Sequence, residues 1–233
     1  YERLRTPVLS GEHMKIGVGV LTWNHRKTGR EQMFYDTLLS LTNGGQAVDV
    51  VVVTNGSTDG TQDTVKRMGG IVDDTDSRIW YGMTRAIEEC IARGADIVLF
   101  TADDIVYADG WAAKLAAFWQ DAPEEVKLCS LLLEPVYPWN TIRGTLDAGG
   151  TRAILRDSVG GCSWSFRAAD WPTIGPLPHV MPGEDLVVCQ KLISQGYYIA
   201  AVDLGEHVGE KHSAWLNESW KYAIPLDRER WGI

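Results

Sequence analysis

The sequence lacks the features that mark membrane, secreted and nucleic-acid-binding proteins. It contains no apolar run long enough to span a bilayer, and no charged start followed by an apolar core that predicts a signal peptide. Its 4 cysteines are scattered without a Cys-x-x-Cys pair, a pattern that predicts buried, reduced thiols in place of disulfides or a zinc site. The formal net charge of −9 disfavours broad binding to nucleic acid or anionic lipid. We therefore expect a cytoplasmic protein with no integral membrane segment.

The sequence also has no internal repeat, no low-complexity tract and no linker that would divide it. Residues 1–14 are polar and irregular, and we interpret them as an N-terminal extension. Residues 15–233 are long enough for one α/β domain, with a change of pattern near residue 121 that separates a first part, 15–121, from a second, 122–233.

Strand-like and helix-like segments alternate through the first part, which predicts an α/β fold with parallel strands and helices on both faces of the sheet. The predicted strands are 15–22, 48–54, 70–73 and 96–101, and the predicted helices are 30–42, 58–68, 80–93 and 110–120. The helix at 110–120 has apolar residues at helical spacing, and we expect Asp109 to cap it. In the second part we expect strands at 127–133, 160–166 and 198–202, a helix at 186–195, and loops elsewhere, with 134–160 unassigned.

Two adjacent carboxylates, Asp103 and Asp104, follow the apolar strand at 96–101. Mg²⁺ and Mn²⁺ take one or two protein carboxylates and fill their remaining positions with water and phosphate oxygens, so this pair suits a metal that carries a phosphate. An acidic, solvated turn is the alternative interpretation of the pair taken alone.

Polar residues also follow two other predicted strands. The first strand runs into Thr22-Trp23-Asn24-His25, and the second runs into Asn55-Gly56-Ser57-Thr58-Asp59. In open α/β sheets, ligands bind outside the carboxyl ends of the strands, so these segments and the carboxylate pair predict one binding edge.

With these motifs the chain resembles inverting family 2 glycosyltransferases of the GT-A fold, which use nucleotide-sugars. The resemblance runs from Lys15 to Ser213 and is carried by five segments in the order of the family: Thr22-Trp23-Asn24, Asn55–Thr61, Ala102-Asp103-Asp104, Gly183-Glu184-Asp185-Leu186 and His207-Val208-Gly209. It implies a Rossmann-like, mostly parallel central sheet flanked by helices. It further implies a nucleotide-sugar-binding half at 15–121 and a loop-rich half at 122–233 that binds the acceptor and carries the catalytic residues.

The resemblance also implies roles for particular residues. Asp104 is expected to bind the metal, since Ala102 replaces the first acidic residue of the family's metal triplet, and His207 is favoured over His212 as a further ligand. Mn²⁺ is expected ahead of Mg²⁺ because it accepts imidazole more readily. Asp185, ahead of Glu184, is expected to be the general base. The expected donor-binding residues are Thr22, Asn24, Asn55, Ser57, Asp59, Arg78 and Asp103.

The expected reaction moves a sugar from a nucleotide-diphosphate sugar to an acceptor hydroxyl, with inversion. A UDP-sugar is the first expectation for the donor, with GDP and dTDP open. The acceptor class stays open among glycans, lipid-linked sugars, proteins and modified nucleobases. Two other functions remain: a nucleotidyltransferase, although Gly17-Val18-Gly19 within a strand does not resemble a triphosphate-binding loop, and a catalytically silent nucleotide-sugar-binding module.

Overall fold

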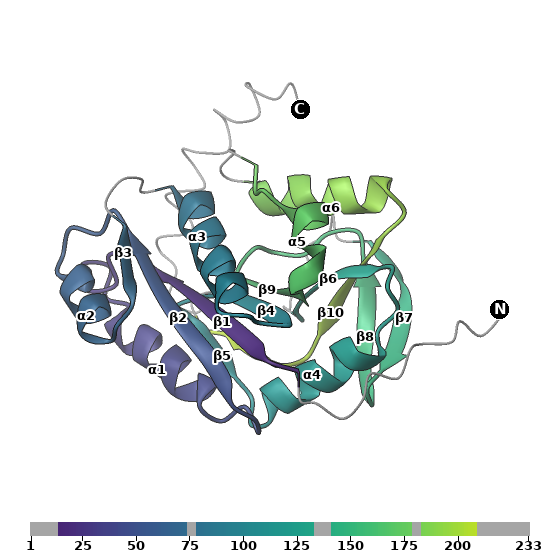
Figure 1. Ribbon diagram of the computed structural model, residues 1–233, viewed down its shortest axis with the longest axis horizontal. Coiled ribbons are helices and arrows are strands. Elements are labelled where there is room, and N and C mark those ends of the chain that lie inside the picture. Colours follow the sequence, from purple (N-terminus) through teal and green to yellow (C-terminus); the bar gives the residue numbers. More distant parts are fainter. Residues whose placement is uncertain (1–13, 74–77, 133–140, 179–182, 209–233) are drawn as a thin grey trace.

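A nine-stranded sheet forms the centre of the computed structural model, which describes residues 14–73, 78–132, 141–178 and 183–208 (Figure 1). The strands lie in the order β3 (Ile71–Asp73), β2 (Val48–Asn55), β1 (Ile16–Thr22), β4 (Ile97–Ala102), β9 (Ser163–Arg167), β6 (Val126–Leu131), β10 (Tyr198–Val202), β8 (Thr151–Arg156) and β7 (Ile142–Ala148). A separate two-stranded sheet pairs β5 (Ile105–Tyr107) with β11 (Gly205–His207).

Parallel pairing dominates the first part of the chain, as the alternating sequence pattern predicts. Strands β2 and β4 both pair with β1 in parallel, and β3 extends this group beside β2. Strand β9 then runs antiparallel between β4 and β6, and β7 and β8 form an antiparallel hairpin at the edge. The expected α/β class is confirmed, and the sheet is mixed in its second part.

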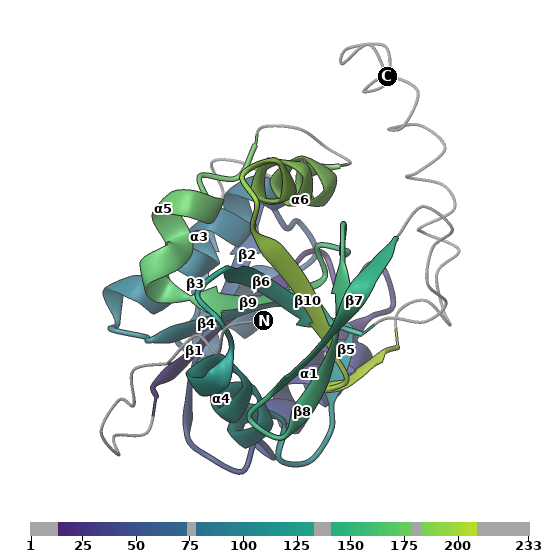
Figure 2. The same ribbon diagram turned by 90° about the vertical axis from the view of Figure 1, so that its right-hand side faces the viewer.

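Helices cover both faces of this sheet. They are α1 (Glu31–Leu41), α2 (Thr61–Arg67), α3 (Ile79–Ala92), α4 (Trp111–Asp121), α5 (Trp171–Ile174) and α6 (Glu184–Ser194). Helices α3, α5 and α6 lie on one side of the sheet, and α1 and α4 lie on the other, in both views (Figures 1 and 2). Within the described residues, no helix combines the length and apolar character needed to cross a membrane.

The centre of the core lies where α3 packs against β1. All seven residues of β1 are buried, and two of them, Gly17 and Gly19, lie under the helix. A Cβ added at Gly19 would come within 2.9 Å of the Cβ of Ala86, so the absence of a side chain lets α3 approach the sheet closely. Gly82, one turn earlier on α3, makes the same close approach to Leu21. This packing fixes the carboxyl end of β1, where the predicted site begins.

The large apolar residues of α4 are buried, with Trp111, Phe118 and Trp119 each at most 1% exposed. The expected cap at Asp109 is wrong. Gly110 is the residue before the helix, in a left-handed conformation with φ of 75°, and no side chain caps the helix. The start of α2 also differs, because Gly60 takes a left-handed conformation and delays the helix to Thr61.

The segment left unassigned at 134–160 contains the β7–β8 hairpin, so this part of the second half is less loop-rich than expected. Its two strands join through Gly149 and Gly150, both with positive φ. All 4 cysteines carry free thiols, as expected; Cys90, Cys129 and Cys189 are buried, whereas Cys162 is only partly buried. Residues 1–13 of the expected extension and His212 lie outside the described residues.

Candidate active site

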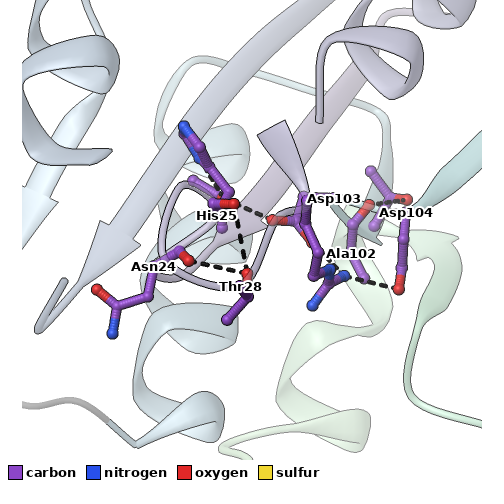
Figure 3. Close-up of polar contacts among 9 residues, drawn as sticks. Asn24, His25, Thr28, Ala102, Asp103 and Asp104 are labelled. Atoms are coloured by element: carbon purple, nitrogen blue, oxygen red, sulfur yellow. Dashed lines mark hydrogen bonds and ion pairs between the residues drawn. The ribbon is translucent and has the colours of Figure 1, made fainter. Parts of the chain in front are cut away.

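A buried polar network lies at the carboxyl ends of β1 and β4. The Thr22 hydroxyl donates a hydrogen bond of 2.6 Å to Asp103 Oδ2 and lies 3.1 Å from His25 Nδ1. The other oxygen of Asp103 accepts a hydrogen bond from Arg30 Nη2 at 2.5 Å, and the same nitrogen lies 2.6 Å from Asp104 Oδ2. Figure 3 shows Asp103 between Asp104 and the loop that carries Asn24, His25 and Thr28. We call Thr22, His25, Arg30, Asp103 and Asp104 the acid network.

Both acidic side chains of the acid network are shielded from water, with 4% of the Asp103 side chain and 11% of the Asp104 side chain exposed. Burial raises the pKa of Asp103 to about 6, because desolvation penalises its charged form more than the Arg30 cation favours it. The neighbouring Asp104 charge raises the pKa of Asp103 further, and the Thr22 hydrogen bond opposes the rise. The site therefore concentrates negative charge in a place where cations bind strongly.

His25 and Arg30 belong to this network, and sequence reasoning missed both. His25 is fully buried, stacks on Phe34 with ring centroids 4.6 Å apart, and has its pKa lowered by burial. Arg30 immediately precedes α1, where the positive end of the helix dipole disfavours a cation. A basic residue just before a helix therefore indicates that an acidic side chain from another part of the fold pairs with it.

The expected donor-binding residues of the first two strand exits hold two loops together. Asn24, the one non-glycine residue with positive φ in the described part of the chain, donates from its backbone nitrogen to Ser57 Oγ at 3.0 Å. The Asn24 side-chain oxygen accepts a 2.8 Å hydrogen bond from Thr58 N. Asp59 accepts hydrogen bonds from Lys27 N at 2.6 Å and from Thr61 N at 3.0 Å. Burial acts to raise the pKa of Asp59, and these hydrogen bonds together lower it.

Asn55 and Arg78 lie next to these loops on the α3 side. The Asn55 amide donates a 2.8 Å hydrogen bond to the carbonyl of Arg78, just before α3 begins. The Arg78 guanidinium is exposed and lies 4.7 Å from the centre of the Trp80 ring. The structure thus brings the predicted residues of three strand exits to one edge of the sheet.

The start of α6 supplies the second acidic group. Asp185 accepts a hydrogen bond of 3.1 Å from Gly161 N and one of 2.8 Å from Leu186 N, so both of its oxygens are held by backbone donors. Burial raises the pKa of Asp185, and these backbone hydrogen bonds limit the rise. Glu184 is 8% exposed, and its Oε2 accepts a hydrogen bond of 3.1 Å from Gly183 N.

Asp185 is connected to the end of β4 through the backbone. Gly161, which donates to Asp185, precedes Cys162, whose carbonyl accepts a 2.8 Å hydrogen bond from Ala102 N. Ala102 is the last residue of β4 and directly precedes Asp103 and Asp104. The second acidic group therefore belongs to the same edge of the sheet as the acid network.

Backbone pairing also brings His207 to this edge. Strand β11 runs antiparallel to β5 with His207 opposite Ile105, and Val208 N donates a 2.9 Å hydrogen bond to the Asp104 carbonyl. Over the described ranges, no group of three or more Asp, Glu, His or Cys side chains is arranged to hold a metal ion. The two carboxylates nevertheless match the oxygen ligands that Mn²⁺ and Mg²⁺ take when phosphates complete their coordination.

Comparison with known proteins gives a family and a fold. The family model described as "Glycosyl transferase family 2" matches residues 18–164. No curated protein matches this sequence.

Solved structures with the same fold share little sequence with the chain. The mannosyltransferase PcManGT from Pyrobaculum calidifontis, in complex with GDP-Man and Mn²⁺, has a TM-score of 0.64 at 17% identity over 85% of this chain and 58% of its own. A structure of S. aureus TarS residues 1–349 has a TM-score of 0.59 at 17% identity over 84% of this chain and 60% of its own, and another contains UDP-GlcNAc.

A third similar structure is CMP:2-keto-3-deoxy-manno-octonic acid synthetase complexed with CTP, with a TM-score of 0.54 at 18% identity over 88% of this chain and 99% of its own. The chain spans less than two thirds of the length of PcManGT and of the TarS fragment. At these identities the likenesses show the fold, which is that of the GT-A glycosyltransferases.

Proposed function

Since the chain belongs to glycosyl transferase family 2, we propose that it moves a sugar from a nucleotide-diphosphate sugar to an acceptor hydroxyl. The observation that carries this proposal is the single edge of the sheet that holds the acid network, the loops after β1 and β2, and the start of α6. Ligands of open α/β sheets bind at such an edge. We propose residues 15–233 as one domain, with the donor on 15–121 and the acceptor on 122–233.

Asp104 and His207 would hold Mn²⁺ or Mg²⁺ at this edge, with Asp103 contacting the metal or the ribose of the donor. A divalent cation bound there neutralises the charge that develops on the leaving diphosphate. Mn²⁺ is our first choice, because His207 would add an imidazole to the oxygen ligands. GDP-Man and Mn²⁺ in PcManGT support this choice.

The loops after β1 and β2 would form the nucleoside side of the donor site. We propose that six side chains surround this part of the site: Thr22, Asn24, Asn55, Ser57, Asp59 and Arg78. Because the side chains of Asn24 and Asp59 are engaged in holding backbone groups, they shape this pocket and limit its movement. We propose a UDP-sugar as the donor first, since a TarS structure contains UDP-GlcNAc, with a GDP-sugar second.

Asp185 would act as the general base. Its raised pKa strengthens it as a proton acceptor, and the Gly161 and Leu186 donors fix the orientation of its carboxylate. The acceptor oxygen attacks the anomeric carbon as its proton passes to Asp185, and the bond from that carbon to the diphosphate oxygen breaks. A single displacement of this kind inverts the anomeric configuration. The buried free thiols fit a reducing compartment, so we place the reaction in the cytoplasm.

A donor hydrolysis assay separates the proposed function from its two alternatives. The protein is incubated with Mn²⁺ and a panel of UDP-, GDP-, dTDP- and CMP-sugars, and in parallel with nucleoside triphosphates and sugar phosphates. Release of a nucleoside diphosphate that falls at least about a hundredfold in Asp185→Asn supports glycosyl transfer, because general bases contribute about that much or more. Release of pyrophosphate from a triphosphate would instead identify a nucleotidyltransferase. Donor binding without any turnover would identify a silent binding module.

Glu184→Gln is the matched control for the choice of base. If Asp185 is the base, Asp185→Asn removes turnover while the Kd for the donor stays within about threefold of the wild-type value. Equal losses in both variants would assign the base to neither residue alone. The anomeric configuration of the released sugar, read by NMR within the first turnovers, tests inversion.

A further inference from the structure

We propose that Arg30 is an exchangeable cation of the donor site. Without metal its guanidinium pairs with both Asp103 and Asp104, and when the metal and donor bind it leaves those oxygens and turns to the diphosphate of the donor. This inference rests on the proposed function and adds a residue that no sequence motif assigned to the site. It predicts that Arg30 opposes the binding of metal alone and favours the binding of metal with a nucleoside diphosphate.

The Arg30 guanidinium contacts both carboxylates. A single nitrogen, Arg30 Nη2, lies 2.5 Å from Asp103 Oδ1 and 2.6 Å from Asp104 Oδ2. Two adjacent buried carboxylates would repel one another and lose their hydration without a cation between them. Arg30 therefore binds the carboxylate oxygens that would ligate a divalent cation, so the guanidinium and the metal ion compete for the same oxygens.

Arg30 is held in this position less firmly than the two carboxylates are. Its side chain is 22% exposed, whereas those of Asp103 and Asp104 are 4% and 11% exposed, so the guanidinium is the solvent-facing member of the cluster. Its backbone lies at the positive end of the α1 dipole, which disfavours a cation there. The carboxylates, by contrast, are anchored: the Thr22 hydroxyl holds Asp103, and Val208 N holds the backbone carbonyl of Asp104.

The charge balance of the site favours this exchange. Without metal and donor, two carboxylates and one guanidinium leave one net negative charge. A divalent cation with the two negative charges of a bridging diphosphate adds no net charge, so the loaded site keeps the same balance if Arg30 stays nearby. Guanidinium groups bind phosphate oxygens through paired, charge-assisted hydrogen bonds, so the displaced Arg30 gains a partner when the donor is present. With metal alone it gains none.

Direct measurement of Mn²⁺ binding tests the proposal without an activity assay. Free Mn²⁺ is followed by electron paramagnetic resonance while it is titrated into the whole chain, with and without UDP or GDP. We expect Arg30→Gln to bind Mn²⁺ alone at least about tenfold more tightly than wild type, since a single opposite charge at this range changes proton affinity by about ten- to a thousandfold. We expect a nucleoside diphosphate to raise Mn²⁺ affinity by about fivefold or more in wild type, within the usual range of coupling, and by less in Arg30→Gln.

Arg26→Gln is the matched control, because it removes the same charge from the same loop. Arg26 pairs with Glu31 at 3.4 Å and donates to Thr64, and neither partner belongs to the acid network. Its Mn²⁺ affinity should stay within about twofold of wild type, consistent with a screened surface charge. Asp104→Asn in the Arg30→Gln background should abolish the gain, which places the bound ion at the acid network.

Two results would overturn the proposal: Mn²⁺ affinity in Arg30→Gln that equals or falls below that of wild type, or equal coupling to the nucleotide in both proteins. If Arg30→Gln folds poorly, Arg30→Lys takes its place, because it keeps the charge but loses the planar fork. The proposal then requires Arg30→Lys to bind Mn²⁺ alone more tightly than wild type does. If the Mn²⁺ measurements contradict the role of Arg30 but wild type still turns over a donor, the proposed function stands. Failure of donor turnover alone, with the Mn²⁺ results as expected, removes the transferase proposal and keeps a metal and nucleotide site.

Discussion

Replacing Thr22 by valine tests whether the acid network stabilises the fold through hydrogen bonds. The Thr22 side chain is 1% exposed, and its hydroxyl donates to Asp103 at 2.6 Å while lying 3.1 Å from His25 Nδ1. Valine keeps the branched shape that β1 requires and removes only the hydrogen-bonding group. The change therefore isolates the polar contribution of one atom.

The expected cost follows from these two contacts. A hydrogen bond to a charged group contributes about 1.5–3 kcal/mol, and a buried donor or acceptor left without its partner costs about 1–3 kcal/mol. Because the two effects share one hydroxyl and do not simply add, we expect Thr22→Val to lower the free energy of unfolding by about 2–4 kcal/mol. For a domain of this size that corresponds to a fall in Tm of roughly 4–16 °C.

Urea unfolding at neutral pH measures this loss as a shift of the midpoint at constant m. Thr42→Val is the control, because the Thr42 hydroxyl is exposed and donates to Leu39 O at the end of α1. We expect that control to stay within about 0.5 kcal/mol of wild type. If Thr22→Val also falls within about 0.5 kcal/mol, the acid network contributes nothing measurable and the reasoning is refuted.

Three further outcomes are expected. Burial lowers the pKa of His25 below 6.5, so on acidification the unfolded chain takes up a proton at this residue before the folded protein does. The free energy of unfolding should therefore be highest above pH 6.5 and fall as the pH drops through the lowered pKa of the folded state. Urea unfolding across this range should show a shallower dependence of stability on pH in His25→Asn, and equal slopes would contradict the assignment. Gly82→Ala should destabilise the fold by about 1–3 kcal/mol, since the added Cβ would come within 2.5 Å of Leu21 Cδ1. The control Gly94→Asn should lower stability less, because an added Cβ there meets nothing within 4 Å and Asn tolerates the φ of 79°. A larger loss of stability in Gly94→Asn than in Gly82→Ala, measured by thermal unfolding, would exclude overpacking. Asp185→Asn should leave Tm within a few degrees of wild type or raise it, because burial disfavours its charge, and a large fall in a calorimetric scan would show that its carboxylate is structural.

The parallel centre of the fold could be predicted from sequence because its signals are local. Strand β2 reads as an uninterrupted β-branched run, Val50 to Val53, which is typical of a strand covered on both faces. The β7–β8 hairpin was missed because β7 is largely exposed and therefore lacks a strong hydrophobic alternation. The paired glycines at 149–150 were a usable turn signal within that segment.

The candidate site divides in the same way. Thr22 and Asp103 could be assigned to one edge, since both lie at the carboxyl ends of parallel strands, and they are hydrogen-bonded in the structure. The contacts of Arg30 could not be assigned, because they join residues 73 positions apart and depend on a side chain crossing from the start of α1 to the end of β4. Sequence spacing gives the strand ends, and only packing determines which charges meet there.

The central claim is that a nucleotide-sugar and a divalent cation bind together at the acid network. The most direct test is the thermal midpoint of the chain against UDP-, GDP-, dTDP- and CMP-sugars, with and without Mn²⁺, in wild type and Asp104→Asn. A ligand at a hundred times its Kd stabilises the folded state by about 2.7 kcal/mol, which is easily resolved as a shift. We predict a shift for one nucleotide class that requires Mn²⁺ and disappears in Asp104→Asn. No shift with any donor, or the same shift in Asp104→Asn, would contradict the account.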